Sequence, residues 1–291
     1  MAARMGLSQD LGFATKRQLA TKILARAHTE RVVFDFVCAD EVYGNSPDLR
    51  GYCEQNQQGY VLRVPSNFPL VLSDQSTATC KHIVRRHLKP KRRWQIVSAG
   101  AGDKGERLYG WAWVATDSAQ HWLLVRKHLT SGELAYHLCF VPQGQPVTLG
   151  RLVAAAGLRW PIEEDFEFGK DLFGLDQAQV RLYEAIGRHT VLVMAALAVC
   201  AVAAARARPH TDTQAPAPKG PDDVPPLVPG HVPLSVAGVK NLLSALNLHQ
   251  PTLEHRIHWQ NWRDRHRARA RWHHQRTRLA RPLRQPYPQV N

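Results

Sequence analysis

The segment that most constrains the fold is a short apolar run that leads into acidic residues, RVVFDFVCADEVYG. Residues 32–37 are dense in β-branched and aromatic side chains, which favours a strand that ends at Asp40. Apolar and polar residues hardly alternate, so we expect this strand to be buried on both faces, as in a parallel sheet. A turn, a short helix around residues 47–56 and a second strand at 59–65 follow, and together they predict a βαβ unit.

The rest of the chain changes pattern several times. A helix is expected at residues 9–30, and residues 66–147 contain short strand-like runs separated by turns that contain glycine. A helical pattern returns at residues 148–173, and eight prolines at 209–233 indicate an extended linker. We therefore expect an α/β protein with a β-rich insertion, a Pro-rich linker and a basic helical tail. The expected divisions are 1–65, 66–147, 148–208, 209–233 and 234–291.

Three features bear on the compartment of the protein. The five cysteines are far apart and include no C-x-x-C pair, which argues against a disulfide framework or a zinc site and fits a reducing cytosol. The N-terminal residues show no apolar core of a signal peptide. An apolar run at 190–205 has 16 uncharged residues, fewer than the roughly 18 to 20 that a spanning helix needs. We interpret this run as a buried core helix, and a membrane span is the alternative.

The charge of the chain favours nucleic acid as a partner. Its net charge is +14, and a field of this sign attracts polyanions. Residues 81–93 hold seven Lys or Arg and no acid, and residues 254–291 hold ten Arg with three interleaved Trp. Arg binds phosphate bidentately and indole rings stack on bases, whereas a solvated face or a partly disordered tail is the alternative. The candidate contacts are Lys81, Arg85, Arg86, Lys91, Arg92, Arg93, Arg265, Arg267, Arg269 and Arg271.

A glycine motif, GAGDKG at residues 100–105, matches the spacing of a dinucleotide-binding loop. Such a loop also needs a helix after it, because the pyrophosphate binds at the helix N-terminus. The residues that follow, ERLYGWAWVA, are rich in aromatic side chains and lack helical spacing. We therefore predict a hairpin turn here and no nucleotide site.

A second acidic stretch, RWPIEEDFEFGK at residues 159–170, lies far downstream of Asp40. Two-metal phosphoryl transfer needs carboxylates that converge from separate elements, and the carboxyl end of a strand is a suitable place for one of them. Side chains alternate along a strand, so Glu41 is expected to point to the face opposite Asp40. On a helix, Arg159, Glu163 and Lys170 would share one face within about 60°. From spacing alone, a solvated helix face is the alternative to a metal site.

The two motifs ADEVYGNSPDLR and RWPIEEDFEFGKDLFGLDQAQVR resemble those of bacterial insertion-sequence transposases of the DDE type, which have an RNase H-like catalytic core. In that family the second catalytic Asp ends a core strand, and the Glu lies in a pattern of Tyr, Arg, Glu and Lys. The resemblance implies that Asp40 and Glu163 are catalytic metal ligands. It also implies that Arg159 and Lys170 are the motif cations and that a β-rich insertion separates Asp40 from Glu163.

The chain departs from the family pattern at three places. Ala156 occupies the position of the motif Tyr. Pro161 either kinks a helix that contains Arg159 or starts a helix that leaves Arg159 outside. Before Asp40 the sequence offers only Asp10, Glu30 and Asp35 as acids, and none of them suits the family's first Asp. The chain therefore resembles the C-terminal part of a transposase, a partial RNase H-like core whose first strands are missing and whose sheet edge is open.

The resemblance implies an enzyme that cleaves and joins DNA ends, with Mg²⁺ or Mn²⁺ bound once the first Asp is supplied. The expected partner is double-stranded DNA at the ends of a mobile element, and self-association or binding to a full-length transposase is a further expectation. We expect no membrane partner, a cytoplasmic, nucleoid-associated location, and no strand transfer by this chain alone. The alternative is a catalytically inactive DNA-binding remnant that inhibits transposition.

Overall fold

The computed structural model describes residues 12–102, 105–180, 182–246 and 252–280. Within these residues the chain divides into two units. The sheet unit comprises residues 13–102 and 106–160, and the helical unit begins at Pro161.

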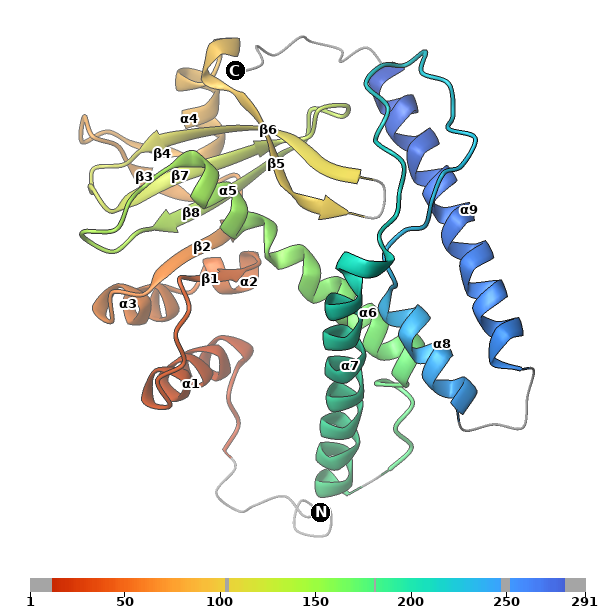
Figure 1. Cartoon of the computed structure of the whole chain (residues 1–291). Helices are drawn as coiled ribbons and strands as arrows, with labels where there is room; N and C mark the ends of the chain where they lie inside the picture. The colour runs from red at the N-terminus through yellow and green to blue at the C-terminus, as the bar shows by residue number, and fades with distance from the viewer. Residues whose placement is uncertain (1–11, 103–104, 181, 247–251, 281–291) are drawn as a thin grey trace. The chain divides into compact units, whose positions relative to one another are not determined.

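The sheet unit is built on a six-stranded sheet with the strand order β1-β2-β8-β7-β6-β5 (Figure 1). Strand β1 is parallel to β2, whereas β2, β8, β7 and β6 pair antiparallel with their neighbours. A separate antiparallel pair is formed by β3 and β4. The bounds are β1 Phe36–Ala39, β2 Gly59–Val64, β3 Pro69–Val71, β4 Thr77–Thr79, β5 Gln95–Gly102, β6 Gly105–Ala115, β7 His121–Lys127 and β8 Leu134–Phe140. This mixed α/β architecture confirms the predicted fold class and is consistent with a partial RNase H-like fold.

The helices of this unit cover both faces of the sheet. Their bounds are α1 Lys16–Thr29, α2 Glu41–Gly44, α3 Pro47–Gln55, α4 Cys80–His87 and α5 Leu149–Gly157. Side chains alternate along β2, so Tyr60 and Leu62 join the core that includes Ile83 of α4. Val61 joins the core on the other face, where Leu152 of α5 packs. We call these the α4 face and the α5 face.

The βαβ unit is confirmed, because α3 connects the parallel strands β1 and β2. The first strand, however, is shorter than predicted, and it lies at an edge of the sheet. Val32 and Val33 precede it and are 52% and 95% exposed. Composition favours a strand at these valines, but no neighbouring strand pairs with them. Both faces of β1 are packed as expected, with Phe36 on the α5 face and Val37 on the α4 face.

Two local boundaries also differ from the predictions. Helix α1 begins at Lys16, because the Thr15 side chain caps it in a capping box with Gln18. The predicted start at residue 9 lies outside the described residues. Within the β-rich segment, α4 is a helix that the strand pattern did not predict, and Thr79 caps its N-terminus.

The glycine motif at residues 100–105 lies between two strands, as predicted. Strand β5 ends at Gly102 and β6 begins at Gly105, so no helix follows the glycines. Gly100 and Gly105 have φ values of +103° and +93°, which side chains with a Cβ rarely adopt. The motif therefore lacks the following helix N-terminus at which the pyrophosphate of a dinucleotide binds.

The helical unit consists of four helices among its described residues. Their bounds are α6 Arg159–Phe173, which starts in the last two residues of the sheet unit, α7 Tyr183–Thr211, α8 Val236–Leu246 and α9 Leu253–Ala280. Helix α8 packs against both α7 and α9. The predicted helical tail is confirmed for the residues of α9.

Helix α7 contains the apolar run, and by length and composition alone it is long and apolar enough to cross a membrane. The prediction of a buried core helix is wrong. A single stripe is buried, which consists of Val193, Leu197, Cys200 and Ala204. Val191 and Leu192 are 67% and 70% exposed. Because alanine and valine surround this helix on all sides, the sequence did not indicate which side would be covered.

The Pro-rich segment folds back on itself and does not extend as predicted. The Thr213 amide donates to the His231 carbonyl at 3.1 Å, and the Ala215 amide donates to the Pro229 carbonyl at 3.0 Å. Gly230 has a φ of +73°, and a Cβ there would meet the Thr213 carbonyl. The two ends of the segment are therefore joined within the helical unit.

Candidate active site

Asp40 lies in the tight turn between β1 and α2. The strand ends at Ala39, and the Asp40 side chain caps α2 by accepting a hydrogen bond from the Val42 amide at 2.9 Å. Aspartate is a favoured residue at this position because its side chain satisfies an unpaired amide of the first turn. The residue is half-buried. Asp40 therefore sits at the carboxyl end of a strand, as predicted, and it also has a structural role that the sequence did not reveal.

Glu41 was expected on the face opposite Asp40, and this expectation is wrong. The strand has already ended, so Glu41 is the first residue of α2 and strand alternation does not apply. Its Oε1 lies 3.1 Å from Nε of Arg63, which follows Val61 by two positions on the α5 face of β2. Glu41 thus belongs to the charged environment of that face.

The second acidic motif forms a single helix that includes Arg159. Pro161 is the third residue of α6, in the first turn, where its missing amide breaks no hydrogen bond within the helix. At 100° per residue, Arg159, Glu163 and Lys170 fall within about 40° of one face. Glu163 and Lys170 are exposed and Arg159 is half-buried. The possibility that Arg159 lies outside the helix is thereby excluded.

Asp40 belongs to the sheet unit and Glu163 to the helical unit, so their convergence around a metal stays a prediction. In the described ranges, no three His, Cys, Asp or Glu residues form a group that could hold a metal ion. Ala156, at the position of the motif Tyr, packs half-buried on the α5 face and provides no hydroxyl.

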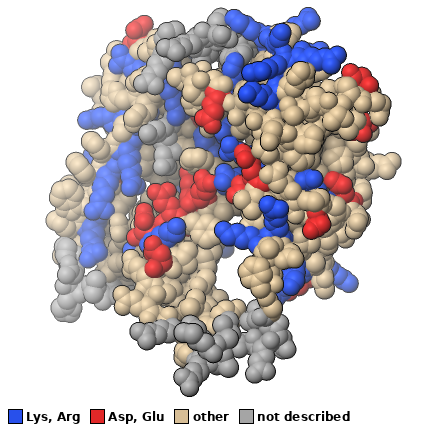
Figure 2. Space-filling model, turned by 180° about the vertical axis from the view of Figure 1, so that it is seen from behind, with Lys and Arg blue, Asp and Glu red and all other residues tan. Residues whose placement is uncertain are grey.

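The first predicted basic segment forms an exposed surface on α4 and the short 3-10 turn Lys91–Arg93. The helix is amphipathic: Cys80 and Ile83 are buried in the core of the α4 face. Figure 2 shows Lys and Arg side chains gathered over this part of the unit. The six predicted contacts of this segment are all exposed, namely Lys81, Arg85, Arg86, Lys91, Arg92 and Arg93.

The second basic segment, α9, uses its arginines in two ways. Arg265 and Arg269 are exposed. Arg267 Nη1 lies 3.4 Å from the Ser235 hydroxyl, and Arg271 Nη1 lies 3.5 Å from Oε1 of Gln214. Arg271 therefore connects α9 to the Pro-rich segment, and Arg267 connects it to Ser235, just before α8.

The three tryptophans of α9 are not equivalent either. Trp259 and Trp262 are 45% and 50% exposed, whereas Trp272 is 6% exposed. Trp272 lies on the buried stripe of the helix together with Gln260, Asp264 and Ala268. Only the first two indole rings are therefore placed where a base could stack on them.

Sequence reasoning missed a cluster of basic side chains on the α5 face of the sheet. Arg63 on β2 is paired in register with His137 on β8, and Arg126 on β7 is paired with Ala135, two residues from His137. The Arg126 guanidinium lies 4.6 Å from the centre of the Tyr109 ring. Arg63 and His137 are each a lone basic residue within an apolar strand, and Arg126 directly follows the apolar run 122–125 of β7. This is the signal that could have revealed them.

Burial changes the acid–base properties of this cluster. It is the main cause that lowers the pKa of His137 to about 3, and the neighbouring Arg126 and Arg63 lower it further. Burial also lowers the pKa of Arg126, to which Arg63 and Arg159 contribute by repulsion. Arg159 is therefore within electrostatic reach of the cluster. His137 is neutral at pH 7.

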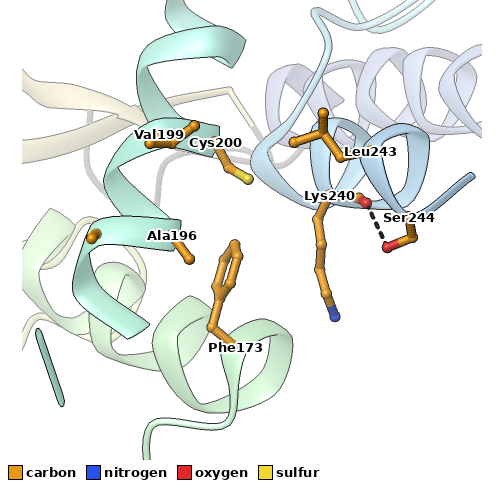
Figure 3. Close-up of a pocket in the computed structure, with 8 residues that line it drawn as sticks. Phe173, Ala196, Val199, Cys200, Lys240, Leu243 and Ser244 are labelled. Carbon is orange, nitrogen blue, oxygen red and sulfur yellow. Dashed lines mark hydrogen bonds between the residues drawn. The ribbon is translucent and has the colours of Figure 1, made fainter. Parts of the chain in front are cut away.

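The helical unit contains an apolar cavity of about 410 Å³. Figure 3 shows Phe173 at the end of α6, Cys200 on α7 and Leu243 on α8 around it. Lys240 is the one charged residue among those that line it, and its Nζ lies 5.9 Å from the centre of the Phe173 ring. With no carboxylate in its lining, this cavity is not a site for metal-dependent chemistry.

The chain was compared with known proteins. A search of curated proteins found no match. Residues 10–199 match the family model of the transposase DDE domain, and this range includes Asp40, Glu163 and the whole six-stranded sheet. The match covers more than half of the chain and contains both acidic motifs in the family order. The protein therefore belongs to the DDE transposase family.

Proposed function

We propose that Asp40 and Glu163 are two of the carboxylate ligands of a metal-dependent DNA-cleaving and strand-joining site. The observation that carries this proposal is the position of Asp40 at the carboxyl end of β1, in a chain whose family match also includes the Glu163 helix. Open α/β sheets place their ligands outside the carboxyl ends of their strands. One Asp40 oxygen accepts from the Val42 amide, and the second oxygen is not used in that bond.

The donor set fits a hard divalent cation. DDE transposases generally use divalent metals, and carboxylate oxygens are the ligands that Mg²⁺ prefers. When bound, the metal would supply an activated water or 3′-hydroxyl nucleophile and would neutralise charge on the reacting phosphate. Before Asp40, Glu30 is paired with Arg26 at 2.7 Å, and Asp35 is on the same chain segment as Asp40. We therefore propose that the third ligand comes from a segment other than residues 12–39.

The cations of α6 have a role beside the carboxylate. Arg159 precedes Glu163 by four residues, about 6 Å along a helix axis, and Lys170 follows two turns later on the same face. In the proposed site, Glu163 binds the metal, while Arg159 and Lys170 bind the phosphates on either side of the reacting bond. Arg suits this role because its guanidinium donates two parallel hydrogen bonds to phosphate.

The wider DNA contact is proposed to involve the exposed basic side chains of α4 and α9. Their guanidinium and ammonium groups would neutralise backbone phosphates, so binding should weaken steeply as salt is added. Such contacts position a protein on the duplex and carry no sequence information. Recognition of a particular DNA sequence at the element ends therefore needs residues other than these basic side chains.

The decisive experiment is a nicking assay with Mg²⁺ and DNA that carries the element ends. The first Asp is supplied by fusing the chain to the corresponding segment of a family relative. Asp40→Ala and Glu163→Ala should each abolish nicking. Asp165→Ala is the matched control, because Asp165 is an exposed acid of α6 about 200° away from Glu163. If either ligand variant still nicks at the rate of the control, the assignment is wrong.

A second candidate function is DNA binding without cleavage, which would occupy element ends or form mixed assemblies with a complete transposase. The exposed basic surface of α4 and its turn favours it, because this surface needs no metal. A gel-shift titration of the unfused chain separates the two functions. Salt-sensitive DNA binding, with no nicking in any fusion, supports DNA binding without cleavage. If the chain does not bind DNA at low salt, this second function is eliminated.

A further inference from the structure

The basic cluster on the α5 face lies beside the proposed catalytic Asp. Ala39 of β1 is in register with Leu62 of β2, so Asp40 comes level with Arg63. Arg63 is in turn in register with His137, and Arg126 lies diagonally from His137 on the next strand. Three basic residues on the adjacent strands β2, β8 and β7 are thus aligned across the sheet from Asp40.

These side chains are poorly satisfied by the protein around them. Arg63 Nε, Arg126 Nε and His137 Nδ1 are buried atoms that have no hydrogen-bond partner among the described residues. The Glu41 carboxylate approaches Arg63 Nε at 3.1 Å, as an ion pair without hydrogen-bond alignment. Arg63 and Arg126 lie on the two strands that flank β8, near enough for Arg63 to lower the pKa of Arg126 by charge repulsion. In a partly dehydrated site such repulsion is unfavourable unless an anion offsets it.

The three residues remain partly accessible to solvent. Each is half-buried and none is closed off from solvent. Helix α5 covers the neighbouring part of the same face, where the Cys38 thiol donates to the Ala155 carbonyl at 3.0 Å. Arg63, Arg126 and His137 therefore combine buried nitrogen atoms with side chains that are only partly covered.

We propose that Arg63, Arg126 and His137 form a binding site for a phosphate group, which in the DNA complex is a backbone phosphodiester next to Asp40. The identification of that phosphate with DNA rests on the proposed function, whereas binding of a phosphate group does not. Two guanidinium groups supply bidentate donors for phosphate oxygens, and the imidazole adds a donor or an acceptor according to its tautomer. Arg159, which contributes to the electrostatics of both Arg126 and His137, adds positive charge at the same place.

The nature of the donors favours phosphate over other anions. A carboxylate offers two oxygens in one plane and needs one guanidinium, whereas a phosphate offers oxygens in several directions. The site has nitrogen atoms from three strands, which suits an anion whose oxygens point in several directions. A metal ion is disfavoured by the same positive charge.

The first test uses inorganic phosphate as the probe and the full chain. Phosphate at 20 mM should raise the unfolding midpoint by roughly 3 °C over chloride at equal ionic strength. Arg126→Gln and Arg63→Gln should lose at least half of this rise. Arg17→Gln, at an exposed arginine of α1 outside the proposed DNA contacts, should keep it. General stabilisation by phosphate as a salt is common to all variants and cancels in the comparison.

The second test distinguishes free phosphate from DNA. Phenylglyoxal modifies accessible guanidinium groups, and peptide mass spectrometry measures the rate at each arginine. Inorganic phosphate should slow modification of Arg63 and Arg126 at least fivefold, and a short DNA duplex should do the same at low salt. Protection by phosphate but not by DNA would overturn the DNA assignment and leave an anion site.

Two outcomes overturn the site itself. One is equal stabilisation of the wild type, Arg126→Gln and Arg17→Gln by phosphate. The other is no protection of Arg63 and Arg126 by phosphate in the wild-type chain, a measurement that does not depend on whether the variants fold. Neither test needs metal or cleavage, so failure of the proposed catalysis and failure of this site give different results.

Discussion

The two faces of the six-stranded sheet are both packed against a helix, but they are built differently. Under α4, the core consists of apolar and aromatic side chains such as Leu62, Leu123 and Ile83. Under α5, an apolar core of similar construction gives way to Arg63, Arg126 and His137 toward the Asp40 end of the sheet. The same strands contribute to both, since alternate residues point to opposite faces.

This difference separates residues that hold the sheet together from residues that are costly to bury. Unpaired basic groups in a partly dehydrated site reduce stability, and natural proteins keep such groups mainly where function requires them. The α4 face is therefore expected to respond to mutation through stability, and the basic end of the α5 face through binding. Four substitutions test this contrast, in order of decreasing effect on the free energy of unfolding.

Leu123→Ala on the α4 face should cause the largest decrease in the free energy of unfolding. Leu123 is completely buried, so truncation removes apolar contacts and leaves a cavity. We expect the free energy of unfolding to fall by about 3 kcal/mol, measured from urea unfolding by circular dichroism. Leu108→Ala, at a leucine that is 50% exposed, is the control and should change it by less than about 1 kcal/mol. Equal losses would show that the α4 face is not the stabilising core.

His137→Leu should make the free energy of unfolding less dependent on pH. Burial holds the pKa of His137 at about 3 in the folded protein, against 6.5 for an ordinary histidine. Between these values the unfolded chain binds a proton that the folded protein does not, so the stability that His137 contributes above pH 6.5 is lost as the pH falls toward 3. From pH 7 to pH 5 the wild type should lose on the order of 1 to 2 kcal/mol more than His137→Leu. Parallel urea midpoints for the two proteins would contradict this.

Arg126→Met should be neutral or should raise the free energy of unfolding by about 1 kcal/mol. Methionine keeps much of the aliphatic volume and removes a buried charge whose Nε has no hydrogen-bond partner among the described residues. The same variant should lose phosphate binding. A loss of more than about 2 kcal/mol would mean that Arg126 is a structural residue, like the members of the α4 face.

Asp40→Asn should have the smallest effect on stability and the largest on activity. Asparagine caps a helix about as well as aspartate, so we expect a change of a few tenths of a kcal/mol in the free energy of unfolding. Asp40→Ala, which removes the cap with Val42, should cost about 1 kcal/mol. Nicking by the fusion protein should be lost in both. Full activity of Asp40→Asn would show that the residue serves only as a cap.

The parts of the fold that depend on neighbouring residues were predictable from the sequence. The βαβ unit, the strands on both sides of the glycine motif and the helical tail each follow from local composition and spacing. Helix α4 was missed because its polar residues are all basic and were interpreted as a charged surface alone. The start of β1 was misplaced because Val32 and Val33 favour a strand, although no other strand pairs with them.

The candidate site divides in the same way. The position of Asp40 at a strand end and the common face of Arg159, Glu163 and Lys170 follow from periodicity. The position of Glu41 could not be predicted from periodicity, because a single residue, Asp40, separates the end of the strand from the start of helix α2. The relation of Arg63, Arg126 and His137 is not contained in the spacing of three residues that are 11 to 74 positions apart.

By itself, the sequence determined most of the helices and strands, where the acidic motifs occur, and which family the chain resembles. Each of these depends on interactions within a few residues, such as turns, caps and the periodicity of apolar side chains. The tertiary structure alone decided that only one stripe of α7 is buried and that three basic residues meet beside Asp40. These depend on the pairing order and register of strands, which are set by contacts between residues distant in the chain.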